Sequence, residues 1–392
     1  MNIAIFTDTY YPEVNGVSTS VDLQRQIFRN RGHRVFIVAP GLKGQNEITF
    51  EDDIMRIPTF SLNFAYTYHM SVRFSNKALK ILKSLSLDLI HAEGEFGLST
   101  FGSDCARKLN IPFVYTFHSA YGNYLDYVSN QFRLIRPFSN RIVTRLVRQM
   151  CAKADETIVP TRYGLNKMRE IYIDKYVNVI PNPVSPSIYE KENDPRKQKE
   201  FIAQHHLEGK KVLLYVGTLS PEKNVAELIT YFEKYLDLYG KDKAALVIVG
   251  DGTSRKELGS EVRDDLKGSV IFVGGVFHEE TPFYYGLADV FVSASTGETQ
   301  GLAFTEAAAA GVPLLLKFGF HLADFIEDGR TGFFYRDFDG FAKGLQTVFS
   351  MTGEEKEGMV SLSREKLLAG NSDETFYENL THVYKKAQRK YF

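Results

Sequence analysis

The chain has 392 residues, which corresponds to two or three domains at roughly 100–200 residues each. Its composition, 44% hydrophobic and 24% charged, excludes a disordered chain, and its formal net charge of −1 argues against a globally basic nucleic-acid-binding protein. Two cysteines are too few for a disulfide scaffold or a cysteine-based zinc module, and they suit a reducing compartment.

The N-terminal apolar run, residues 3–6, is too short for a secretory signal, and no stretch approaches 18 apolar residues. We therefore expect a cytoplasmic protein without a membrane-spanning helix. Residues 1–186 hold 22 Lys+Arg and 16 Asp+Glu, whereas the remainder holds 25 and 32. This asymmetry either arises by chance or indicates that the first half faces an anionic surface.

Short runs rich in Val, Ile and Phe alternate with longer helical segments along both halves of the chain. Continuous apolar runs predict parallel strands covered on both faces, and their alternation with helices predicts a doubly wound α/β fold. The predicted strands are residues 2–6, 35–39, 87–91, 113–117, 157–160 and 177–180, followed by 212–217, 246–250, 270–274, 290–294 and 313–317.

Pro181, Pro183 and Pro186 interrupt this pattern and predict a linker. The fold expected is two Rossmann-like α/β domains facing across a cleft, with residues 1–186 in the first and 187–372 in the second. Apolar residues at helical spacing predict that 373–392 forms a final helix packing back toward the N-terminal domain. Ligands of such sheets bind beyond the carboxyl ends of the strands.

Two strand ends in the first half carry candidate ligand-binding residues. Gly16, followed by Ser-Thr-Ser at a helix start, offers free backbone amides for an anion, or forms only a turn and an N-cap. His118 directly follows the strand 113–117 and could hydrogen-bond a polar ligand, or be a structural histidine.

Lys223 follows the strand 212–217 and is expected in the first turn of the next helix, where a cation opposes the helix dipole. A bound phosphate would explain its position. Pairing of Lys223 with Glu222 or Glu227 is the alternative. Asp251-Gly252, at another strand end, is assigned no role beyond loop geometry.

The strongest group of candidate ligand-binding residues follows the strand 290–294 and leads into an Ala-rich helix. Glu298 lies in the turn and Glu306 in the helix, while the amides of Gln300, Gly301 and Leu302 are free to bind an anion. Because carboxylates accept hydrogen bonds from sugar hydroxyls, acids beside an anion site suit a nucleotide sugar. An N-capping turn with two surface acids is the alternative.

The E-x7-E spacing of Glu298 and Glu306, together with segments 6–20 and 115–121, resembles the GT-B-fold retaining glycosyltransferases of family 4. Within that family, the chain is most similar to enzymes that glycosylate diacylglycerol lipids, and the resemblance covers nearly its whole length. It implies transfer of a hexose from a UDP-sugar to a diacylglycerol or glycosyl-diacylglycerol acceptor, without a metal or other cofactor.

The resemblance also implies roles for individual residues. Gly16 would approach the donor diphosphate, His118 the transferred sugar, and Lys223 would neutralise the diphosphate. Sugar hydroxyls and phosphate would be held by Glu298 and the amides of Thr299, Gln300, Gly301 and Leu302. Glu306 would bind the ribose, and the backbone at Val276 and Phe277 would meet the base.

The sequence departs from the family pattern at three places. Thr218 stands where the family usually has an arginine of the cationic pair on the diphosphate, and threonine cannot replace a guanidinium. The linker reads Pro181-Asn182-Pro183 instead of the common Pro-Asn-Gly, and residues 318–321 lack the usual acidic character. These departures leave the donor identity open.

Residues 127–154 contain no acid and interleave basic with apolar side chains, which suits an anionic membrane surface or a solvated helix. The arginines expected to contact lipid are Arg133, Arg136, Arg141, Arg145 and Arg148. We thus expect a peripheral protein on the inner face of the cell membrane. The aromatic residues of segment 60–68 could line an acceptor entrance or form a packed loop.

Three other functions remain compatible with the sequence. A glycosyltransferase for an exopolysaccharide or another soluble acceptor would share the donor residues. A non-catalytic nucleotide-sugar-binding partner is suggested by Thr218, and a GT-B-like epimerase is a weaker third. The oligomeric state, the sugar and the linkage are not predicted.

Overall fold

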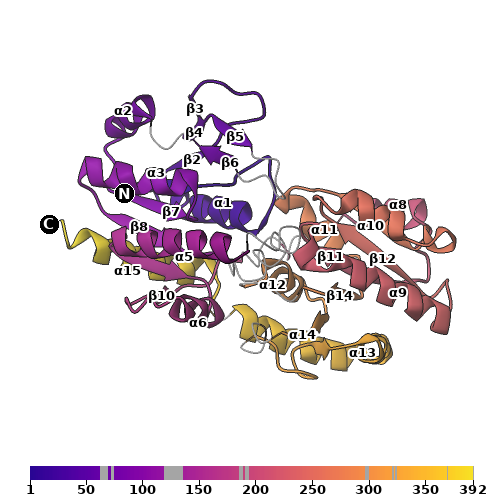
Figure 1. Ribbon diagram of the computed structural model, residues 1–392. Coiled ribbons are helices and arrows are strands. Elements are labelled where there is room, and N and C mark those ends of the chain that lie inside the picture. The colour runs from indigo at the N-terminus through magenta and orange to yellow at the C-terminus, as the bar shows by residue number, and fades with distance from the viewer. Residues whose placement is uncertain are drawn as a thin grey trace. The chain divides into compact units, whose positions relative to one another are not determined.

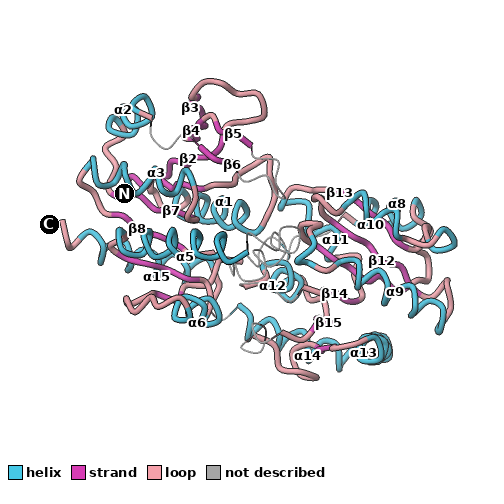
Figure 2. Tube along the Cα trace, viewed as in Figure 1, coloured by secondary structure: helices cyan, strands magenta, loops and turns pink. Residues whose placement is uncertain are grey.

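Each half of the chain forms a mainly parallel sheet between helices (Figures 1 and 2). The computed structural model describes residues 1–61, 69–71, 75–118, 136–184, 189, 194–295, 300–319, 322, 325–368 and 370–391, without side chains at 59–61, 69–71 and 136–140. The described chain divides into two units. Unit 1 comprises Met1–Pro183 and Asp373–Phe392, and unit 2 comprises Val184–Ser372. The linker boundary thus lies three residues before the expected one.

Unit 1 holds an eight-stranded sheet in the order β10-β9-β8-β7-β1-β2-β4-β3, in which only the β3–β4 pair is antiparallel. Its strands are β1 (Asn2–Thr7), β2 (Arg34–Pro40), β3 (Thr49–Glu51), β4 (Ile54–Ile57), β7 (Leu89–Glu93), β8 (Phe113–Thr116), β9 (Glu156–Val159) and β10 (Asn178–Val179). A separate antiparallel pair joins β5 (Thr59–Ser61) to β6 (His69–Ser71).

Both faces of this sheet are buried, as the continuous apolar runs predict. Along β1, Ile3 and Ile5 face one core while Ala4 and Phe6 face the other, because successive side chains of a strand alternate. The first core is covered by α1 (Gly16–Arg29) and α15 (Asp373–Gln388). The second is covered by α2 (Asn76–Ser84), α3 (Gly97–Leu109), α5 (Arg136–Lys153) and α6 (Arg162–Glu170).

The C-terminal helix α15 therefore belongs to unit 1 (Figure 1). Its Tyr384 ring lies 5.6 Å from the ring of Phe28 on α1, and Lys386 forms an ion pair with Glu156 on β9 at 2.8 Å. Residues from the two ends of the chain thus complete the same core.

Unit 2 holds a six-stranded parallel sheet in the order β13-β12-β11-β14-β15-β16. Its strands are β11 (Lys211–Val216), β12 (Ala244–Val249), β13 (Val270–Gly274), β14 (Val290–Ser293), β15 (Leu314–Lys317) and β16 (Phe333–Tyr335). Its helices are α8 (Pro195–Gln204), α9 (Val225–Tyr239), α10 (Arg255–Glu261), α11 (Thr281–Tyr285), α12 (Leu302–Ala309), α13 (Phe338–Ser350) and α14 (Gly353–Leu368), with 3-10 turns η1 (Pro221–Lys223), η2 (Asp264–Leu266) and η3 (His278–Glu280).

The connectivity of unit 2 reverses between β11 and β14, which are neighbours in the sheet but not in the chain. Open α/β sheets bind their ligands at the carboxyl ends of the strands beside such a switch point. The segments after β11 and β14 contain Lys223 and the Glu298–Glu306 motif. The topology therefore puts η1, which contains Lys223, and the start of α12 at this edge of the sheet.

Candidate active site

In unit 1, strand register puts three polar residues side by side at the carboxyl edge of the sheet. Glu93, the last residue of β7, pairs with Thr7 of β1 on one side and with Thr116 of β8 on the other. His91 and Glu93 lie two residues apart on β7, as do Thr116 and His118 at the end of β8, so these four side chains point to the same face. This is the face covered by α1 and α15.

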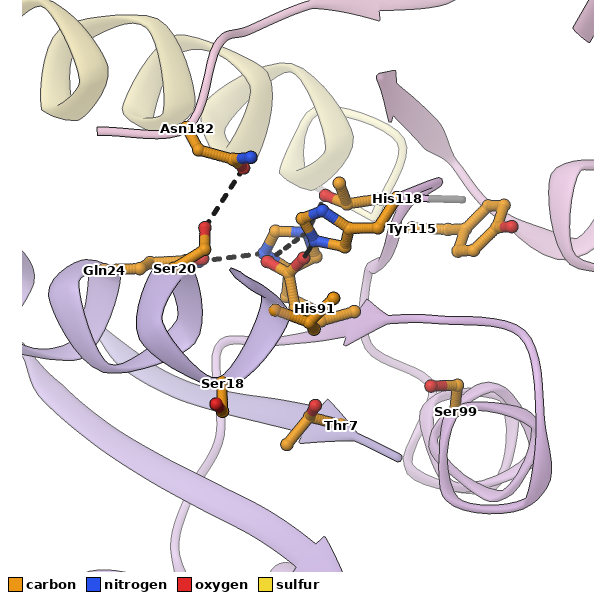
Figure 3. A network of polar contacts seen from close by, with 12 residues as sticks. Thr7, Ser18, Ser20, Gln24, His91, Ser99, Tyr115, His118 and Asn182 are labelled. Atoms are coloured by element: carbon orange, nitrogen blue, oxygen red, sulfur yellow. Dashed lines mark hydrogen bonds and ion pairs between the residues drawn. The ribbon is translucent and has the colours of Figure 1, made fainter. Parts of the chain in front are cut away.

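Side chains from both covering helices reach these strand residues, and Figure 3 shows Gln24 of α1 beside His91. The ring nitrogen Nδ1 of His91 lies 3.0 Å from the Gln24 amide nitrogen on α1 and 2.8 Å from the Tyr384 hydroxyl on α15. The Gln24 amide also donates to the Tyr384 hydroxyl at 2.8 Å. Burial lowers the pKa of His91, although nearby Glu93 opposes this shift. The ring is therefore neutral, and its Nδ1 accepts.

The other nitrogen of His91, Nε2, consequently carries the proton and donates to Thr116 Oγ1 at 2.7 Å. The Thr116 hydroxyl in turn donates to the Glu93 carboxylate. Glu93 Oε2 also contacts His118 Nε2 in a short hydrogen bond. Burial raises the pKa of Glu93, but the two histidines and these hydrogen bonds outweigh it and leave that pKa lowered, so Glu93 is ionised.

Two further acids, Asp8 and Glu95, lie buried near this edge. Asp8 caps the start of α3 by accepting from the Phe96 and Leu98 amides at 3.1 and 2.8 Å. Glu95 Oε2 accepts from the Tyr115 hydroxyl at 3.0 Å, whereas Oε1 has no partner within the described residues. Burial raises the pKa of Asp8, and it raises the pKa of Glu95 to about 8. Glu95 is thus largely protonated at pH 7.

In the first turn of α1, backbone amides that the sequence predicted to be free donate hydrogen bonds within the protein. Asn15, which the sequence reasoning did not single out, is the N-cap, and its Oδ1 accepts from the Val17 and Ser18 amides at 3.0 Å each. Ser18 completes a capping box rather than acting as the N-cap itself. The Thr19 amide also donates, to the Asn15 carbonyl at 3.0 Å, so the amides of Val17, Ser18 and Thr19 are not free for an anion.

In unit 2, Pro221 opens a helical turn that contains Lys223, as expected, but this turn is a 3-10 turn separate from α9. This turn, η1, ends at Lys223, and α9 begins at Val225 after Asn224, whose φ of 53° breaks the helix. Lys223 therefore precedes the N-terminus of α9. Thr218 lies between β11 and this turn and is half-buried; its carbonyl accepts from the Tyr215 hydroxyl at 3.1 Å.

Glu227, the alternative partner considered for Lys223, is engaged elsewhere. Its two carboxylate oxygens lie 2.6 and 2.5 Å from Nζ of Lys317, the last residue of β15. Oε2 also accepts a hydrogen bond from the side-chain amide of Asn224 at 3.0 Å. The carboxyl edge of this sheet thus carries two lysines, of which the sequence analysis identified only Lys223.

A glycine turn, which the sequence analysis did not predict, immediately precedes α12. Gly301 caps α12 with φ 71°, and a Cβ there would lie 2.0 Å from the Phe304 ring, so only glycine fits. Gln300 is buried and Leu302 is the first residue of α12. The predicted residues Glu298 and Thr299 lie outside the described residues.

Glu306 is buried on α12, where neighbouring side chains already hydrogen-bond its carboxylate. His278 Nε2 lies 3.0 Å from Oε1, and the Tyr285 hydroxyl donates to Oε2 at 2.9 Å. The predicted base-contacting residues Val276 and Phe277 immediately precede His278, and the Phe277 ring is exposed. The sequence analysis did not single out His278, although it follows the predicted strand 270–274, or Tyr285, which lies inside α11.

Comparison with known proteins identifies the family to which the chain belongs. Residues 14–188 match the family described as "Glycosyltransferase Family 4", and residues 197–365 match "Glycosyl transferases group 1". The chain is 32% identical over 382 residues to alpha-monoglucosyldiacylglycerol synthase of Streptococcus pneumoniae, covering 96% of this chain and 85% of that protein. The chain is a family 4 glycosyltransferase.

Another relative of this glycosyltransferase has the same name, whereas others are named as mannosyltransferases. Alpha-monoglucosyldiacylglycerol synthase of Acholeplasma laidlawii is 28% identical over 88% of this chain and 87% of that protein. A GDP-mannose-dependent alpha-mannosyltransferase of Corynebacterium glutamicum is 26% identical over 85% of this chain and 76% of that protein. The Anabaena protein HepE, solved with UDP-glucose, shares the GT-B fold with a TM-score of 0.74 at 15% identity, over 98% and 99% of the two chains.

The glycosyltransferase also presents the basic stripe that its sequence indicates on α5. Arg141, Arg145 and Arg148 are exposed at helical spacing and line one shallow surface hollow, while Val147 and Met150 pack into the core. Arg148 additionally donates to the Ile171 carbonyl at 2.8 Å. Arg133, the Arg136 side chain and the aromatic side chains of segment 60–68 lie outside the described ones.

Two features are absent from the described residues of the glycosyltransferase. None of their helices is long and apolar enough to cross a membrane. Nor do the described His, Cys, Asp and Glu side chains form a group of three or more that could hold a metal ion.

Proposed function

We propose that this glycosyltransferase transfers a hexose, with retention, from a UDP-sugar to diacylglycerol or a glycosyl-diacylglycerol. The observation that carries the proposal is the 32% identity to a monoglucosyldiacylglycerol synthase over 96% of the chain. The basic stripe on α5 supports it independently, because an enzyme acting on a lipid hydroxyl must work at a membrane surface that is often anionic.

In the proposed reaction, the bond between the sugar C1 and the β-phosphate oxygen breaks while a bond from C1 to the acceptor oxygen forms on the same face. The acceptor's proton passes to the departing phosphate, which leaves as UDP. Lys223 and the amides at the start of α12 stabilise the charge that develops on the diphosphate. Gly16 approaches the diphosphate, Glu306 holds the ribose, and His118 contacts the sugar.

A screen of donors and acceptors tests the proposal. Purified protein is incubated with UDP-glucose, UDP-galactose, UDP-N-acetylglucosamine or GDP-mannose and with vesicles containing diacylglycerol or monoglucosyl-diacylglycerol, with and without EDTA, and products are identified by mass. We expect a UDP-hexose to be transferred to a lipid in both conditions. Transfer from GDP-mannose, which the mannosyltransferase relatives keep open, or to a soluble saccharide without vesicles, would contradict the proposal.

The α5 stripe makes a separate prediction about membrane binding. Replacing Arg141 and Arg145 together with glutamine should weaken binding to vesicles containing anionic lipid by roughly 30-fold, since each basic residue near such a surface contributes about 1 kcal/mol. Sedimentation with vesicles of phosphatidylglycerol and phosphatidylcholine at low salt measures this.

A matched control separates the stripe from net charge. Lys197 and Lys199 are exposed on α8 of unit 2, so replacing both with glutamine removes the same charge elsewhere. We expect that control to bind nearly as well as the original protein. Equal losses in the two double variants would show that α5 is not the membrane contact.

A further inference from the structure

The carboxylate of Glu306 is enclosed by three aromatic side chains of unit 2. His278 Nε2 lies 3.0 Å from Oε1, and the Tyr285 hydroxyl donates to Oε2 at 2.9 Å. The Tyr189 hydroxyl lies 3.4 Å from the same histidine nitrogen and also hydrogen-bonds Glu306. Because only 7% of the Glu306 side chain is exposed, a ligand can approach this carboxylate from one narrow direction.

Both tyrosines beside Glu306 keep their hydroxyl protons. Burial, together with the nearby carboxylate, holds the pKa of Tyr189 and that of Tyr285 well above their ordinary range. Each hydroxyl therefore has one proton to donate at neutral pH. The Tyr285 hydroxyl also lies 3.0 Å from the carbonyl of Ala303, one turn before Glu306 on α12. It thus connects the carboxylate to the backbone of its own helix.

The rings that carry these hydroxyls are fixed by packing. Tyr285 is buried, and its ring lies 6.2 Å from the ring of Phe291 on β14. The ring of Tyr189 meets that of Tyr285 edge to face at 5.7 Å. Because packed rings fix the direction in which their hydroxyls point, they also favour one orientation of the Glu306 carboxylate.

We propose that Tyr189 and Tyr285 are positioning residues that hold Glu306 so that it accepts a hydrogen bond from one ribose hydroxyl of the donor. This inference rests on the proposed function, in which Glu306 holds the ribose. A carboxylate has about four lone-pair sites, and the three enclosing side chains leave at least one of them for a ligand. A nucleotide without that hydroxyl should bind weakly, because the buried acceptor would then lose its partner.

The first test measures nucleotide binding by calorimetry, without any reaction. UDP, 2′-deoxy-UDP and 3′-deoxy-UDP are titrated into the full chain, and one deoxy form should bind about 10–100-fold more weakly than UDP. In Tyr285→Phe and in Tyr189→Phe, which keep the ring and remove the hydroxyl, this ratio should fall by about 10-fold. Tyr235→Phe, which removes the hydroxyl of another buried tyrosine of unit 2, on α9, should leave the ratio unchanged.

The second test asks whether the tyrosines act through Glu306. In Glu306→Ala the carboxylate is absent, so adding Tyr285→Phe should weaken UDP binding no further. A tyrosine that only supports the fold would weaken UDP binding by the same factor with and without Glu306, and it would weaken the binding of UDP and of both deoxy forms alike. Either result would overturn the inference. If Glu306→Ala does not fold, the ratios in the single phenylalanine variants decide.

The inference and the proposed function fail in different ways. UDP and GDP carry the same ribose, so the titrations are repeated with GDP and its deoxy forms if UDP does not bind. The expected ratios without sugar transfer to any acceptor would contradict the proposed function and support the inference. Transfer from a UDP-hexose together with equal binding of UDP and both deoxy forms would overturn the inference alone. Failure of both nucleotides to bind would overturn both.

Discussion

Replacing Lys223 with alanine should lower kcat by about 10²–10³-fold, the cost typical of removing one group that stabilises developing negative charge. At the two positions of the cationic pair expected from the family, this chain has Thr218 and Lys223, so the lysine supplies the only side-chain charge of the pair. Steady-state kinetics with saturating acceptor in vesicles measures the effect.

Two control variants and one gain-of-charge variant test whether the effect of Lys223 comes from its charge. Lys223→Arg keeps the charge and should retain most activity, and Lys256→Ala, which removes an exposed lysine of α10, should retain all of it. Thr218→Arg should raise kcat by about 10-fold, since a charge-assisted hydrogen bond contributes about 1.5–3 kcal/mol.

Ligand binding shows whether the lysine acts on phosphate. In Lys223→Ala, inhibition by UDP should weaken by about 10–100-fold, while inhibition by uridine, which has no phosphate, should not change. Equal weakening of both inhibitors would assign Lys223 to the nucleoside or to the fold. This comparison also works if the chain is a non-catalytic nucleotide-sugar-binding partner.

Replacing Glu95 with glutamine should stabilise unit 1 at pH 8 and leave its stability nearly unchanged at pH 5. Burial raises the pKa of Glu95 from its ordinary value of 4.5 to about 8, so between these values the folded protein binds a proton that the unfolded chain has lost. The stability of the original protein therefore falls as the pH rises through this window.

Glutamine does not ionise, and it keeps an oxygen to accept from the Tyr115 hydroxyl. With about 1.4 kcal/mol for each pKa unit, the advantage of the variant at pH 8 should be roughly 2–4 kcal/mol. The groups facing Glu95 are Tyr115 on β8, Asp8 after β1 and Cys151 on α5, and burial holds the pKa of each above its ordinary value.

Urea unfolding at pH 5, 6.5 and 8 measures this effect in the full chain. Because the chain has no tryptophan, Phe50→Trp on β3 provides a fluorescence signal from unit 1 in both proteins. Asp174→Asn, at an exposed acid of the same unit, should show no such trend with pH. A Glu95→Gln advantage that is the same at all three pH values would contradict the assignment.

Much of the fold follows from local sequence. Runs such as Ala244–Val249 are apolar at every position, which requires a strand covered on both faces, and the alternation of such runs with helices leaves few topologies other than two doubly wound units. His118 and Lys223 were also identifiable, because each follows one of these runs at the edge where ligands bind.

Other features depend on contacts between elements that are far apart in the sequence. Glu93 ends a strand just as His118 follows one, but its importance appears only when β7 is placed between β1 and β8, so that register brings Glu93 beside Thr116. The ion pair of Lys317 with Glu227 likewise joins the end of β15 to the first turn of α9. No local pattern encodes either contact.

The sequence by itself predicted the long buried strands and the strand ends at which ligand-binding residues occur, since these depend on periodicities of a few residues, but it did not predict the short strands β3, β4, β5, β6 and β16. Only the tertiary structure decided which hydrogen-bond donors meet which acceptors. Asn15 accepts from backbone amides of α1, and the hydroxyl of Tyr384, near the other end of the chain, contacts His91. Hydrogen bonds depend on distances of about 3 Å and on direction. These are decided by strand register and helix packing, which residue spacing along the chain does not specify.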